Sequence, residues 1–136
     1  MKLDLARYRT LFLEEGSEHL AELSRALLEL EKDAGSPEAI DAAFRMAHSI
    51  KGMAASLGYD PITEVAHRLE DRMQRARSAG CVAAVDLALL FKGLEGLEAM
   101  LAAVRDGREA PPADPGLVRA LAVLVDPPEK KAPSPR

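Results

Sequence analysis

Residues 36–61, SPEAIDAAFRMAHSIKGMAASLGYDP, contain a complete helix, its stop signal and the start of the next helix. Ser36 offers a capping oxygen, and Pro37 suits the first helical position. Apolar residues then recur in steps of three and four, which predicts a helix with one buried face. They are Ile40, Ala43, Ala47, Ile50, Ala54 and Leu57. Gly58 ends the segment, and Asp60-Pro61 begins another.

The same signals divide the rest of the chain. Asp114-Pro115 is a further start, and Gly35, Gly80 and Gly107 are further stops. We therefore predict helices over residues 4–33, 37–57, 61–79, 82–106 and 115–125.

Each of the first four predicted helices has an apolar stripe. The stripe of the 4–33 helix consists of Leu5, Tyr8, Phe12, Gly16, Leu20, Leu23, Leu27 and Leu30. Those of the third and fourth helices are Ile62, Ala66, Leu69, Met73 and Ala76, and Leu87, Leu90, Leu94, Leu97, Leu101 and Val104. One-sided helices joined by short connections predict an all-α, antiparallel four-helix bundle. The short fifth helix is expected to cover one end or edge.

Composition limits the possible functions. The chain has 136 residues, with 18 basic and 22 acidic side chains and a net charge of −4. This balance gives no broad positive field for binding nucleic acid, and no apolar run approaches the ~20 residues that span a bilayer. The single Cys81 cannot form an internal disulfide, and charged residues interrupt the apolar N-terminus too often for a secretory signal. We expect a cytoplasmic, monomeric domain.

The last stretch, DPPEKKAPSPR, is rich in proline and charge and has nothing to bury. We therefore predict a domain over residues 1–126. Residues 127–136 are predicted to be a linker that leads to further domains.

Within the 37–57 helix, His48 is predicted to face solvent. At 100° per residue it lies about 130° from the centre of the buried stripe, and Lys51 lies about 70° away on the same side. Gly52 lies nearly opposite the core, where a larger side chain would lean back over His48. Because glycine costs about 1 kcal/mol relative to alanine, we interpret Gly52 as leaving the imidazole accessible. Close packing of two helices would also explain a glycine.

His67 and Glu70 repeat this angular pattern on the 61–79 helix, with the same sense of rotation. In an antiparallel pair these two flanks face one groove. His48 and Glu70 are each about nine residues from the connecting turn, and Lys51 and His67 are each about six. We therefore predict that His48 lies level with Glu70, and Lys51 with His67, along one partly exposed seam.

This combination suits phosphoryl transfer. A carboxylate that accepts the proton of one imidazole nitrogen makes the other nitrogen a better nucleophile. A lysine ammonium suits the oxygens of a phosphoryl group. We predict that His48 carries the phosphoryl group, that Glu70 orients the imidazole and that Lys51 stabilises the phosphoryl oxygens. The chain has no glycine-rich phosphate loop, so we expect it to bind no cofactor and not to be a kinase alone.

The sequence AHSIKG at residues 47–52, followed by HRLE at 67–70, resembles the histidine phosphotransfer (HPt) domain family, most closely the P1 domains of CheA-type chemotaxis histidine kinases. The likeness covers residues 3–125, including the opening YRTLFLEEGSEHL. It implies that Nε2 of His48 accepts phosphate from ATP on a separate histidine kinase ATP-binding domain, while Nδ1 bonds to Glu70. It also implies that Lys51 and His67 support the site. The phosphate then passes to an aspartate of a response regulator receiver domain. Met53 departs from the family, in which many members have a second small residue there.

Two other functions remain open. A metal site could use His48, His67 and Glu70, although a di-iron bundle would need paired Glu-x-x-His motifs and inward-facing ligands on the first and fourth helices. The bundle could also be a purely structural docking module. A basic, solvated outer surface is expected on the 61–79 helix, formed by Arg68, Arg72, Arg75 and Arg77.

Overall fold

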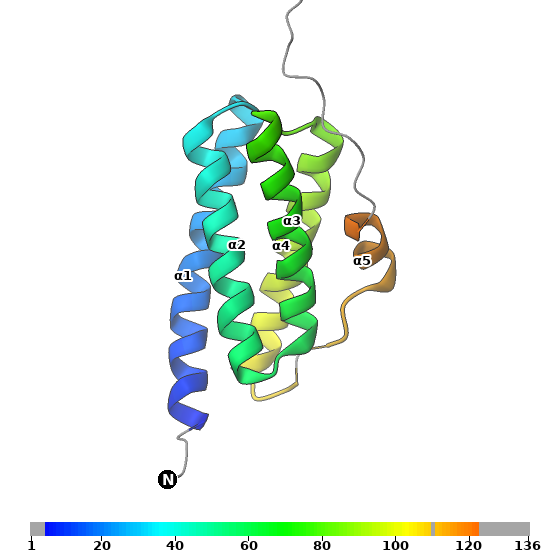
Figure 1. Cartoon of the computed structure of the whole chain (residues 1–136). Helices are drawn as coiled ribbons and strands as arrows, with labels where there is room; N and C mark the ends of the chain where they lie inside the picture. The colour runs from blue at the N-terminus through cyan, green and yellow to red at the C-terminus, as the bar shows by residue number, and fades with distance from the viewer. Residues whose placement is uncertain (1–4, 110, 123–136) are drawn as a thin grey trace, which may run out of the picture.

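The computed structural model describes residues 5–109 and 111–122, and all regular structure in these ranges is helical. The helices are α1 (Leu5–Lys32), α2 (Pro37–Leu57), α3 (Asp60–Ala79), α4 (Ala84–Arg105) and α5 (Pro115–Ala122). Figure 1 shows α1 to α4 running alternately up and down as a bundle, with α5 outside α3 and α4. The predicted all-α architecture is confirmed. None of the described helices has the length and apolarity needed to cross a membrane.

Two of the predicted helix caps are confirmed. The Ser36 hydroxyl accepts a hydrogen bond from the Ala39 N–H at 3.2 Å. The Asp114 carboxylate accepts one from the Leu117 N–H at 2.9 Å. Each side chain satisfies a backbone donor that has no partner within the first turn of its helix.

The turn between α2 and α3 sets the two helices antiparallel. Gly58 has φ 78°, a left-handed conformation that a side chain disfavours. Its N–H donates to Ala55 O at 3.2 Å, and the Tyr59 N–H donates to Ala54 O at 2.9 Å. This pair of bonds is the Schellman arrangement, which satisfies the last carbonyls of α2.

The predicted cap at Asp60 is wrong. Asp60 is the first residue of α3, and Tyr59 occupies the capping position without a side-chain hydrogen bond. The Tyr59 carbonyl already accepts the Thr63 N–H at 2.9 Å. The glycine turn therefore starts α3 one residue earlier than the Asp-Pro pair suggests.

The connection between α1 and α2 also differs from the prediction. Gly35 does not adopt a left-handed conformation, because α1 already ends at Lys32 and the Gly35 N–H donates to Asp33 Oδ1 at 3.1 Å. Val82 lies before α4 rather than in it, and its N–H donates to Ala34 O at 3.0 Å. The two connections at this end of the bundle are therefore hydrogen-bonded together.

The core follows the predicted stripes with few exceptions. Leu23, Leu27, Ala47, Leu69 and Leu97 are among its fully or almost fully buried members. The exception in α1 is the first turns, where Tyr8 is 47 % exposed. These turns extend past the α2–α3 connection in Figure 1, so fewer helices surround them. Residues 123–136, including the predicted linker, lie outside the described residues.

The prediction that Arg72 lies on a solvated basic surface is wrong, because the residue is only 5 % exposed. Its Nε donates to Leu121 O at 3.1 Å and its Nη2 to Ala120 O at 2.7 Å. Its Nη1 bonds to the Asp86 carboxylate in the first turn of α4. Carbonyls at a helix C-terminus attract a cation. Arg72 therefore fastens α5 to α3 and α4.

Candidate functional site

The seam between α2 and α3 brings His48 and Glu70 into contact. Nδ1 of His48 and Oε2 of Glu70 form a hydrogen bond. The His48 side chain is 62 % exposed, whereas that of Glu70 is 11 % exposed. The geometric prediction of a level pair, with the imidazole on the outside, is confirmed.

Glu70 is held as a carboxylate. Burial raises the pKa of Glu70, but hydrogen bonds and positive charge from Lys51 and His48 outweigh it, so the pKa lies below its ordinary value. Lys51 Nζ donates to Oε1 at 2.5 Å, while His48 occupies Oε2. Both carboxylate oxygens therefore have partners.

An ionised carboxylate can only accept hydrogen bonds, so the proton of this pair lies on Nδ1 of His48. In the neutral imidazole, Nε2 then has an available lone pair. Nε2 makes no hydrogen bond to any of the residues that the structure describes. The arrangement presents a nucleophilic nitrogen to solvent and supports it from behind with a negative charge.

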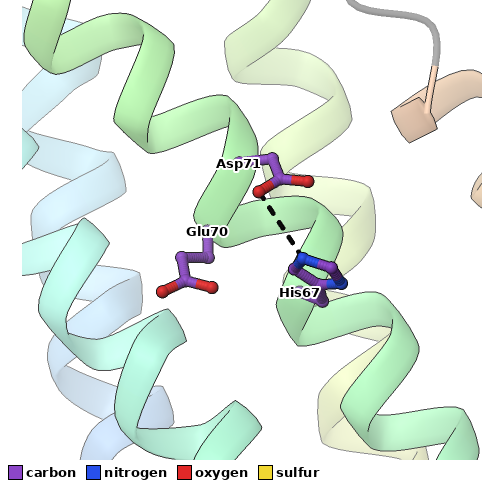
Figure 2. Close-up of side chains that lie close together, drawn as sticks. All are labelled: His67, Glu70 and Asp71. Carbon is purple, nitrogen blue, oxygen red and sulfur yellow. Dashed lines mark ion pairs between the residues drawn. The ribbon is translucent and has the colours of Figure 1, made fainter.

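Lys51 and His67 each pair with another residue, and that the two lie level along the seam stays a prediction. Lys51 bonds to Glu70, and Nε2 of His67 lies 3.7 Å from Oδ1 of Asp71, one turn further along α3. Figure 2 shows His67 and Asp71 together on one side of α3, with Glu70 reaching toward α2. Lys51 bonds to Glu70 because its long side chain places the ammonium within reach of Oε1. A supporting role for His67 stays a prediction, and Asp71 is a neighbour that the sequence did not single out.

Within the part of the chain that the structure describes, His67, Glu70 and Asp71 form a group whose possible ligand atoms lie within 4.8 Å of one another. This set differs from the predicted His48, His67 and Glu70. An ion at this place would compete with His48 and Lys51 for the Glu70 oxygens. The observed hydrogen bonds thus favour a carboxylate that serves the imidazole over one that serves a metal.

Gly52 is open, as predicted. A Cβ atom built on it would meet nothing within 4 Å. Close packing against another helix therefore does not explain this glycine. That it gives partners access to His48 stays a prediction.

Two contacts of the imidazole neighbourhood were not predicted. The ring of Phe44 lies 6.2 Å from that of His48, centroid to centroid, with 15° between their planes. The guanidinium carbon of Arg77 lies 4.4 Å from the Phe44 centroid. The spacing of four residues between Phe44 and His48 was the available signal, because such residues are neighbours on a helix.

The fold and this site define a helical bundle with a solvent-exposed imidazole, that of His48, which the carboxylate of Glu70 holds at Nδ1. Residues 7–107 match the family described as Hpt domain, and the chain belongs to that family. It is 32 % identical over 120 residues to chemotaxis protein CheA of Halobacterium salinarum, a match covering 88 % of this chain and 18 % of the relative. CheA of Bacillus subtilis is 35 % identical over 106 residues, covering 77 % of this chain and 16 % of that protein. The chain thus spans less than a fifth of the length of these relatives.

Solved structures give the same result. The CheA phosphotransferase domain from Thermotoga maritima has a TM-score of 0.70 and 30 % identity, covering 76 % of this chain and 99 % of that one. A solution structure of the histidine phosphotransfer domain of CheA has a TM-score of 0.72 and 30 % identity, covering 85 % and 89 % of the two chains. The similarity therefore extends over the bundle as a whole.

Proposed function

We propose that this chain is the phosphocarrier domain of a chemotaxis-type histidine kinase, with the phosphoryl group carried on Nε2 of His48. One observation carries the proposal. The carboxylate of Glu70 holds Nδ1, while the His48 side chain is 62 % exposed to solvent. Similarity to CheA domains supports the same function.

The transfer needs no cofactor on this chain. The Nε2 lone pair attacks the γ-phosphorus of ATP held by a histidine kinase ATP-binding domain. The N–P bond forms, the P–O bond to ADP breaks, and ADP leaves with that electron pair. The ring becomes more positive as the bond forms, and the Glu70 carboxylate stabilises the Nδ1 proton. Lys51 lies beside this pair and supplies positive charge for the phosphoryl oxygens.

The second step returns the ring to its starting state. A carboxylate oxygen of an aspartate on a response regulator receiver domain attacks the phosphorus, and the N–P bond breaks with its electron pair returning to Nε2. The domain then acts as a substrate of the kinase and a donor to the regulator. In this proposal it works as a cytoplasmic monomer.

Radiolabelled ATP and the ATP-binding region of the cognate kinase test the function. The chain should take up acid-labile, base-stable phosphate, and His48→Gln should abolish uptake. His19→Gln on α1 is the matched control and should label like the parent, while His67→Gln reports on the supporting role. Uptake that survives His48→Gln would overturn the assignment.

A further inference from the structure

The imidazole of His48 needs a restraint in addition to Glu70. A hydrogen bond at Nδ1 restrains one atom, but small rotations about the Cα–Cβ and Cβ–Cγ bonds can still tilt the plane of the ring. Its side chain is 62 % exposed, so general packing does not enclose it. The direction of Nε2 therefore depends on what lies against the face of the ring.

Phe44 occupies that position. It precedes His48 by one helical turn, and helical side chains lean toward the N-terminus, so the imidazole lies back over the phenyl ring. The centroid distance of 6.2 Å and the angle of 15° correspond to an offset stack. Phe44 is itself partly buried against the core.

Arg77 holds the phenyl ring from the neighbouring helix. Its guanidinium carbon lies 4.4 Å from the centroid of Phe44, within the range of a cation–π contact. Its Nη2 lies 3.9 Å from Oδ1 of Asp41, which also pairs with Arg45. Arg77 belongs to α3, the helix that carries Glu70. Both restraints on the imidazole are thus tied to the α2–α3 pair.

We propose that Phe44, held by Arg77, is a positioning residue for phosphoryl transfer at His48. Its ring sets the plane of the imidazole and thereby the direction of Nε2. Phe44 has no group that exchanges protons or contacts phosphate through hydrogen bonds, so it acts only through His48. The inference rests on the proposed function.

Phosphoramidate tests the inference without a protein partner. Nε2 attacks its phosphorus, the N–P bond to His48 forms, the P–N bond of phosphoramidate breaks, and ammonia leaves with that electron pair. Phe44→Leu keeps apolar bulk but removes the flat ring, and we expect it to slow this labelling about 3- to 10-fold because the nucleophile is misaligned. Phe44→Tyr keeps the ring and should restore the parent rate. Phe91→Leu on α4 is the matched control, because within the described helices no Cα atom of α4 lies within 8 Å of one in α2.

Arg77→Gln gives a second variant that leaves the core untouched, since the Arg77 side chain is 42 % exposed. We expect a loss of about twofold, the size of an exposed cation–π contact. With the kinase domain and ATP, Phe44→Leu should lower kcat and leave KM unchanged. A positioning role predicts this pattern, whereas a docking role would raise KM.

The outcomes separate the two hypotheses. Unchanged phosphoramidate labelling in Phe44→Leu would overturn the positioning role, as would a failure of Phe44→Tyr to recover the rate. A change confined to KM with the kinase would overturn it as well and assign Phe44 to docking. Parent protein that takes no phosphate at His48 from either donor would overturn the proposed function, and this inference with it.

Discussion

Two charged side chains of α3, Glu70 and Arg72, lie on opposite flanks of one helix. Over the whole residue, Glu70 is 8 % exposed and Arg72 is 5 % exposed, so burial does not distinguish them. Their partners do. Glu70 faces α2 and bonds to His48 and Lys51, both of which reach solvent. Arg72 faces the other way and bonds to Asp86 and to backbone carbonyls of α5.

The difference shows how a functional buried charge can be told from a structural one. Each of the three guanidinium nitrogens of Arg72 donates to an acceptor inside the protein. Glu70 instead bonds to Nδ1 of His48, and the second nitrogen of that imidazole, Nε2, remains available. We call Arg72, Asp86 and the α5 carbonyls the closed cluster, which stabilises the fold. We call His48, Lys51 and Glu70 the open cluster, because Nε2 of His48 remains available for a reaction.

The largest expected effect comes from breaking the closed cluster. Arg72→Ala should lower the free energy of unfolding by about 3 kcal/mol, because it leaves the partly buried Asp86 carboxylate and two carbonyls of α5 without their donor. Urea denaturation measures this loss. Arg45→Ala is the matched control, since that side chain is 56 % exposed in its pair with Asp41, and it should cost about 0.5 kcal/mol.

Phosphorylation of folded Arg72→Ala should stay within about twofold of the parent rate, because its contacts are separate from those of His48. A large loss of labelling with unchanged stability would contradict the division into a closed and an open cluster.

The open cluster should respond in the opposite way. Glu70→Ala should slow phosphorylation of His48 about 10- to 100-fold, by analogy with the loss of a carboxylate that orients a metal-bound histidine. Its free energy of unfolding should change by less than about 1 kcal/mol, because both partners can turn to water. Single-turnover labelling and urea denaturation measure the two effects. A parent-like rate would show that the Glu70 contact has no part in the transfer.

Sequence predicted the open cluster well because its geometry is local. The positions of His48 and Glu70 follow from helix periodicity and one short turn, which the Gly58 signal fixes. The closed cluster could not be predicted in this way. Arg72 has a buried role only because α5 returns across α3, and residue spacing within α3 does not contain that information. The partner of Lys51 was likewise missed, because a long flexible side chain reaches beyond its own level.

The packing of α4 against α3 gives the next effect. A Cβ atom on Gly93 of α4 would lie 2.6 Å from Cδ2 of Leu69, the residue before Glu70. Gly93→Ala should therefore destabilise the protein by about 1–2 kcal/mol through overpacking, despite the better helix propensity of alanine. Thermal unfolding measures the change. Gly93→Ala combined with Leu69→Val should recover part of it, and an unchanged melting temperature would contradict the tight α3–α4 contact.

A pH series sharpens the assignment of charge to Glu70. Its pKa is lower in the folded protein than in the unfolded chain, so its pairing contributes stability above the unfolded value and loses it as pH falls through the folded one. The parent should exceed Glu70→Gln in unfolding free energy by up to about 1 kcal/mol at neutral pH. Urea titrations should show this advantage disappearing in acid. An advantage that grows in acid would mean that Glu70 is protonated in the native state.

Gly52 offers the smallest effect and the most direct contrast with Gly93. Its Cβ position is empty, so Gly52→Ala should raise the unfolding free energy by about 0.5–1 kcal/mol, the helix propensity difference. The same substitution thus has opposite signs on the two flanks of α3. A longer side chain tests access: Gly52→Leu should lean over the turn that carries His48 and slow kinase-driven labelling. Ser56→Leu, one turn further along α2, is the control and should label normally. If Gly52→Leu labels as fast as that control, access to His48 does not account for a glycine that weakens the helix.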